Sequence, residues 1–157
     1  MIHPYLAYCN LVWASKLRPN YQARLKRLTV LQNRAIRVII GCFNASFSTE
    51  TLYIKQLRIL KIGQITALQV NEFMYKHYNN LLPSIFSDYF TIISQVNPYD
   101  FRSSNNYMYR SIYSRINTRM FSIKCVGPNA WNLIPFDLQL LPNRSSFKRN
   151  LRNYLLD

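Results

Sequence analysis

The spacing of apolar residues predicts a long amphipathic helix over residues 20–41. One face of that helix would carry Leu25, Leu28, Ala35 and Ile39, which recur at steps of three, seven and four residues. Asn20 can cap the first turn, and Gly41 suits the left-handed position after a last turn. Gln32 falls on the apolar face, so we expect a polar contact within the packing.

The opposite side of this helix is basic. It carries Lys26, Arg27, Arg34 and Arg37, with Arg24 at its margin, and these five are the candidate phosphate contacts of the helix. Residues 1–49 contain seven Lys or Arg and no acid, whereas a helix that is merely solvated usually mixes signs, because Glu–Lys pairs four residues apart stabilise it. The one-signed face favours contact with a polyanion, and a simple solvated face is the alternative.

Weaker patterns fill the rest of the chain. Helices are expected over residues 51–60, over 65–80 after a join at Gly63, and over 84–90 with Pro83 in the first turn. Residues 91–117 lose the helical period and predict a long loop with short extended pieces. A strand is expected over residues 120–126, stopped by the dipeptide 127–128, and Ser145 or Ser146 would begin a short C-terminal helix.

These patterns predict a mainly α fold. We expect a small helical bundle with an irregular Arg/Tyr-rich loop region, room for one short strand, and a short C-terminal helix. Residues 1–90 form a helical region, and residues 91–157 form an irregular basic region that ends in that helix. The two regions are expected to pack as one unit, since 49% of the chain is hydrophobic and 15% aromatic, enough for a core.

The net charge of the chain limits the classes of partner that it can bind. Twenty Lys and Arg stand against six Asp and Glu, for a net charge of +14, which favours polyanions such as nucleic acid or anionic lipid. No apolar run approaches the roughly 20 residues that a membrane helix needs, and the start lacks the basic-then-apolar order of a secretory leader. We therefore expect a soluble, intracellular protein with no membrane partner.

Catalytic and metal chemistry find little support. The six acids are scattered, whereas two-metal catalysis needs convergent carboxylates. Three distant cysteines and two histidines do not have zinc-site spacing, and no phosphate-binding glycine loop occurs. His77 lies in a helical run, where a packing role is expected. We expect no enzymatic activity in this chain and no cofactor or metal.

Arginine and tyrosine alternate in residues 99–119. The arginines are Arg102, Arg110, Arg115 and Arg119, and they are interleaved with Tyr99, Tyr107, Tyr109 and Tyr113. Arginine binds phosphate in a fork geometry and tyrosine stacks on unpaired bases, a combination that suits single-stranded or hybrid nucleic acid. Tyr107 and Tyr109 are the expected stacking rings. The alternative is a surface loop whose tyrosines pack against the helices and whose arginines are solvated.

Several short words along the chain together resemble a known family. They are residues 3–13 (HPYLAYCNLVW), 28–37 (LTVLQNRAIR), 57–62 (LRILKI), 73–76 (FMYK), 82–83 (LP), 127–135 (GPNAWNLIP) and 146–148 (SFK) with Leu151. In this order they resemble the region after the palm in reverse transcriptases of LINE-type, non-LTR retrotransposons, with jockey-like and related animal elements the most similar. Each word alone is weak, but the set in order is fairly specific.

The resemblance implies a bounded role. In the family, the parent polypeptide is an RNA-directed DNA polymerase with an endonuclease, and this region supplies thumb-like helices and a C-terminal part. The palm carboxylates, the endonuclease acids and the zinc knuckle of some relatives have no counterpart here. What carries over is the gripping of template, primer or their hybrid, with partners RNA, DNA or RNA–DNA hybrid and the upstream polymerase domain. The implied location is a nuclear or cytoplasmic ribonucleoprotein.

Two rival functions stay open. In one, the chain is a structural module or non-functional remnant that packs against the missing polymerase domain and needs it for solubility. In the other, it is a basic component of a ribonucleoprotein unrelated to transposition. A polymerase-like reading frame upstream in the flanking DNA would favour the retrotransposon interpretation, and its absence would favour the unrelated ribonucleoprotein component.

Overall fold

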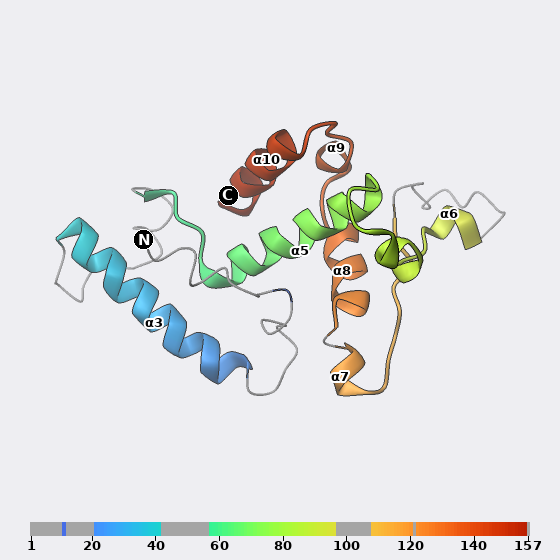
Figure 1. Cartoon of the computed structure of the whole chain (residues 1–157). Helices are drawn as coiled ribbons and strands as arrows, with labels where there is room; N and C mark the ends of the chain where they lie inside the picture. Colours follow the sequence, from blue (N-terminus) through green and yellow to red (C-terminus); the bar gives the residue numbers. More distant parts are fainter. Residues whose placement is uncertain (1–10, 12–20, 42–56, 97–107, 121, 157) are drawn as a thin grey trace.

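The computed structural model describes Leu11 and residues 21–41, 57–96, 108–120 and 122–156 (Figure 1). Of these residues 71% are helical, and they form no sheet, so the expected mainly helical fold is confirmed. The elements, in order, are α3 (Tyr21–Ile40), α5 (Ile62–Tyr78), the 3-10 helix η2 (Ser84–Tyr89), α6 (Ile93–Val96), α7 (Asn117–Met120), α8 (Ile123–Asn132), α9 (Phe136–Gln139) and α10 (Arg144–Leu156).

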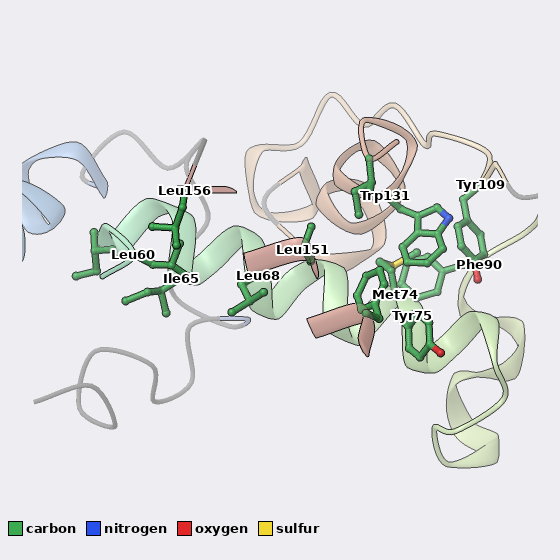
Figure 2. Packing of buried hydrophobic residues seen from close by; sticks show 13 residues of the cluster. Leu60, Ile65, Leu68, Met74, Tyr75, Phe90, Tyr109, Trp131, Leu151 and Leu156 are labelled. Carbon is green, nitrogen blue, oxygen red and sulfur yellow. The ribbon is translucent and has the colours of Figure 1, made fainter. Parts of the chain in front are cut away.

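Helix α5 is the centre of the packing, and α8 and α10 lie against it (Figure 1). Figure 2 shows Met74, Tyr75, Phe90, Tyr109 and Trp131 gathered at one end of α5, where each side chain is at most 6% exposed. Leu60, Ile65 and Leu156 extend the cluster along the helix to its other end. The aromatic end is tied together by ring contacts, among them a stacked pair of Tyr75 and Phe147 with centroids 4.4 Å apart.

Helix α8 corrects the strand expected over residues 120–126. Ile123–Asn132 is helical, and both Gly127 and Pro128 lie inside the helix rather than at its end. A Cβ at Gly127 would lie 2.6 Å from Met74 Sδ, so the glycine lets α8 approach α5 closely. Pro128 lacks an N–H and forgoes one helical hydrogen bond. Burial of Cys125, Pro128 and Trp131 on the face toward α5 outweighs these local signals.

The start of α5 also differs from the sequence expectation. Gly63 is the second residue of the helix and not a join, and Gln64 accepts a hydrogen bond from the Lys61 main-chain N–H (2.8 Å) at the first turn. Residues 58–61 are not helical: Arg58 has a positive φ of 47°, and Lys61, just before the helix, is extended. The helix expected over residues 51–60 therefore does not reach residue 58, and its first six residues lie outside the described ones.

Helix α3 docks beside α5 through one row of side chains. The row consists of Leu28, Gln32, Ile36 and Ile40. Ile36 is 2% exposed and packs with Leu57 and Ile59, while Gln32 Nε2 donates to the Leu60 carbonyl (2.9 Å), which confirms the polar contact expected at that position. Gly41 has φ 71°, the left-handed conformation expected there. Ile39, expected on the buried face, is 63% exposed.

An ion-pair group joins α5 to α10. Arg144 donates from Nε (2.8 Å) and Nη2 (2.5 Å) to Glu72 Oε1, and Lys148 Nζ lies 3.6 Å from Oε2. Burial raises the pKa of Glu72, but the Arg144 hydrogen bond and the charges of Lys148, Arg144 and Lys76 outweigh it. The pKa of this carboxyl therefore lies below its ordinary value.

Candidate nucleic-acid interface

The described part of the Arg/Tyr-rich region is a short extended piece that is held on both edges. On one edge, Tyr109 forms an antiparallel bridge with Ile92, and the N–H of Arg110 donates to the Thr91 carbonyl (2.8 Å). On the other edge, the Asn132 side chain at the end of α8 donates to the Tyr109 carbonyl (2.8 Å) and accepts from its N–H (3.0 Å). The main chain at residue 109 is therefore fixed between α8 and the segment before α6.

Tyr109 does not have the stacking role expected of it. Its side chain is 0% exposed, and its hydroxyl lies 2.8 Å from His77 Nδ1. His77 Nε2 lies 3.0 Å from the Phe86 carbonyl, which only accepts, so Nε2 carries the proton and Nδ1 accepts from Tyr109. Burial, followed by the charge of Tyr78, raises the pKa of Tyr109. This ring belongs to the core and is not available to a base; His77 has the packing role expected.

The residues that follow Tyr109 turn outward. Tyr113 is 84% exposed, and Arg110, Arg115 and Arg119 are exposed as well. Ser114, 8% exposed, accepts a hydrogen bond from the Ile116 N–H (3.3 Å) just before α7, which turns the chain around Arg115. No acid occurs in residues 108–120. The exposed aromatic ring among these arginines is thus Tyr113.

Tyr113 was not among the stacking rings expected from the sequence, although it belongs to the same alternating run. Tyr109 is followed by Arg110 and Tyr113 by Ser114, two polar residues, so local sequence does not separate the buried ring from the exposed one. The difference comes from tertiary contacts, since Tyr109 lies where Ile92 and Asn132 clamp the main chain against the aromatic core. Arg102 and Tyr107, the other expected contacts in this region, lie outside the described residues.

A cavity of about 410 Å³ opens beside Arg110. Its lining consists of Ile93, Val96, Tyr109, Arg110, Ser111 and Asn132. The side-chain oxygen and nitrogen of Asn132 are both engaged with the main chain of Tyr109, and Ser111 Oγ donates to Asn129 Oδ1 (2.6 Å). The cavity thus offers an apolar wall from α6 with an exposed guanidinium in its lining, and its size falls within the range of ligand pockets.

The basic face of α3 forms a separate group. Lys26, Arg27 and Arg34 are exposed and Arg37 is half-buried, on the side away from the row that docks on residues 57–60. Arg24 lies in α3, but its side chain is outside the described ones. Helix α3 and α7, which ends the Arg/Tyr-rich segment, stand apart in Figure 1, so these are two basic areas and not one cluster.

The described segments show neither a metal-binding group nor a membrane-spanning helix. These segments hold no group of three or more His, Cys, Asp or Glu side chains placed to bind a metal ion, and Cys125 is a buried free thiol. None of the helices that the structure describes combines the length and apolar character required to cross a membrane. Comparison with protein-family models, with curated proteins and with solved structures found no match.

Proposed function

We propose that this chain binds single-stranded or hybrid nucleic acid without a catalytic centre of its own. The observation that carries the proposal is the exposed ring of Tyr113 between Arg110, Arg115 and Arg119, in a segment that has no acid. The guanidinium groups can donate to backbone phosphates, and the ring can stack on an unpaired base. A duplex does not offer an unpaired base face, so this pairing favours single strands and the single-stranded ends of hybrids.

The basic face of α3 supplies the second contact of this proposal. Lys26, Arg27 and Arg34 are exposed on a helix that contains no acid, so no carboxylate of α3 itself neutralises them. Contacts of this type add affinity without sequence preference and make it depend on salt, because each neutralised phosphate releases counterions.

The resemblance to the post-palm region of LINE-type reverse transcriptases gives this proposal its biological partner. On that basis the nucleic acid is the template, the primer or their hybrid, and the upstream polymerase domain is a second partner. The site of action is then a nuclear or cytoplasmic ribonucleoprotein, and the catalytic carboxylates belong to the parent polypeptide.

Fluorescence anisotropy with a labelled single-stranded RNA of about 20 nucleotides tests the proposal. Tyr113→Ala should weaken binding by about tenfold, the lower part of the range for loss of one stacked base, whereas Tyr113→Phe keeps the ring and should bind like the unsubstituted protein. Ile116→Ala, a matched exposed residue of the same segment (65% exposed), should also leave affinity unchanged.

The charge part of the proposal has its own measurement. Replacing Arg110, Arg115 and Arg119 together by Gln should lower the slope of log affinity against log salt by up to about three, one for each lost phosphate contact. A slope and an affinity that both stay unchanged in a folded triple variant would exclude this segment from the binding site.

A second candidate function is a packing module for the polymerase domain. The observation that favours it is a pair of exposed apolar residues on α3: Leu31 and Val38, seven residues apart and so on one face of the helix, are 57% and 66% exposed. If the upstream domain covers this face, adding that domain should raise the solubility of the chain, and Leu31→Gln with Val38→Gln should abolish the association. If the two substitutions leave the association intact, this face is not the contact.

A further inference from the structure

The contact between residues 58–61 and α10 brings two arginines from distant parts of the chain together. Arg152 Nη2 donates to the main-chain carbonyl of Arg58 (3.1 Å), and Arg58 Nη2 donates to Asn153 Oδ1 (3.3 Å). The two residues are 94 positions apart and both are exposed. The side chain of Gln64 reinforces the contact, since its Nε2 donates to the Leu155 carbonyl.

The backbone of Arg58 has a strained conformation. Its φ of 47° lies in the left-handed region, which is strained for a residue with a Cβ and which glycine adopts freely. Such strain persists only where the surroundings impose it, and it concentrates at functional positions. The fold therefore keeps a strained arginine at a turn where glycine would fit better.

The charge at this point is not neutralised within the described residues. Among the described residues, neither Arg58 nor Arg152 has a carboxylate within ion-pair distance. Glu72, the acid on α5 that faces α10, is bound to Arg144 and Lys148 instead. Each guanidinium has five N–H donors, and one donor of each is used in the contact described above. Arg149, exposed and one turn earlier on α10, adds a third positive charge nearby.

We infer that Arg58 and Arg152 form a phosphate-binding site for the backbone of a nucleic acid, distinct from the segment of residues 108–120. Each guanidinium group is held by one neutral acceptor and keeps further N–H donors for a tetrahedral oxyanion, and a bound phosphate offsets the two like charges. The source of the phosphate rests on the proposed function, whereas the oxyanion chemistry follows from the contact alone. A strand bound here runs along the outer face of α10, past Arg149.

Arg58→Gly is the sharpest substitution because it separates binding from folding. It removes the guanidinium and also relieves the left-handed strain, so the variant should keep or exceed the melting temperature of the unsubstituted protein. Its affinity for a labelled RNA–DNA hybrid should fall roughly three- to tenfold, as should that of Arg152→Gln, and the salt slope should drop by about one. Lys124→Gln is the charge-matched control. Lys124 belongs to α8, and its Nζ lies 3.9 Å from the centre of the Tyr89 ring, so this substitution should not change binding.

A second arm uses inorganic phosphate alone as the probe. Phosphate should raise the melting temperature of the unsubstituted protein above that in chloride of equal ionic strength, and it should not do so for Arg58→Gly. If hybrid binding fails but this shift is present, the oxyanion site stands and the proposed function falls. If the triple substitution of Arg110, Arg115 and Arg119 weakens hybrid binding while both Arg58→Gly and Arg152→Gln bind normally, the proposed function stands and this inference is overturned. The absence of both the phosphate shift and any effect of the two variants also overturns it.

Discussion

Replacing Glu72 with Gln should weaken the attachment of α10 to α5. The substitution keeps the shape of the side chain but removes the negative charge that Arg144 and Lys148 share. Hydrogen bonds to a charged group contribute about 1.5–3 kcal/mol when buried. Glu72 has a side chain only 11% exposed, but those of Arg144 and Lys148 are 52% and 54% exposed, so solvent reduces the effect. We expect a loss of about 1–2 kcal/mol at neutral pH.

The loss should depend on pH in a defined direction. Because the folded protein lowers the pKa of Glu72 below the unfolded value near 4.5, this carboxylate contributes its full stability above that value. The contribution disappears as the pH falls through the folded pKa. The difference in unfolding free energy between the unsubstituted protein and Glu72→Gln should therefore be constant above about pH 5 and shrink progressively below pH 4.5.

Thermal unfolding followed by circular dichroism measures this difference. At neutral pH the expected loss corresponds to a melting temperature roughly 2–8 °C lower for a chain of this size. Asp88→Asn, which removes an exposed carboxylate of η2, is the control and should stay within about 0.5 kcal/mol. An equal loss at acid and neutral pH would show that the loss does not come from the charge of Glu72, and no loss at either pH would refute the ion-pair argument.

Three further predictions test the packing. Gly127→Ala should destabilise by about 1–2 kcal/mol, since the clash with Met74 exceeds the gain in helix propensity, and Met74→Ala should make the same change less costly in a double-mutant cycle followed by urea unfolding. Tyr109→Phe should cost about 1–2 kcal/mol because His77 Nδ1 then loses its buried donor, and it should leave RNA affinity unchanged since the ring is in the core. Gln32→Leu should release α3 first, visible as faster amide hydrogen exchange in α3 than in α5.

Strong helical periodicity was enough to locate the long helices. The helix expected over residues 20–41 is α3, and the helix expected over 65–80 corresponds to α5. The end of α3 at Gly41 and the buried Gln32 could also be predicted, because each depends on local conformation or on the face of one helix. The exposure of Ile39 could not be, since it depends on where the partner segment ends.

Local signals failed where tertiary packing opposes them. Gly127 and Pro128 ordinarily end an element, yet both lie inside α8, because the glycine is what lets α8 approach Met74 on α5. No residue near position 127 contains that information; it resides about 50 positions earlier in the chain. The same limit applies to Tyr109 and Tyr113, which are 0% and 84% exposed: Tyr109 is held by Asn132 and Ile92, which lie 23 and 17 positions away in the sequence.

The words that resemble the reverse-transcriptase family and the residues proposed to bind nucleic acid overlap only in part. Met74, Tyr75, Trp131 and Phe147 all lie within those words and are all fully or almost fully buried, so these parts of the resemblance concern packing. The segment of residues 108–120 belongs to none of the words. Binding through that segment is therefore a separate hypothesis from the resemblance. A variant in which the exposed arginines of this segment are replaced can still fold, and loss of binding in such a folded variant would locate the binding site outside the words.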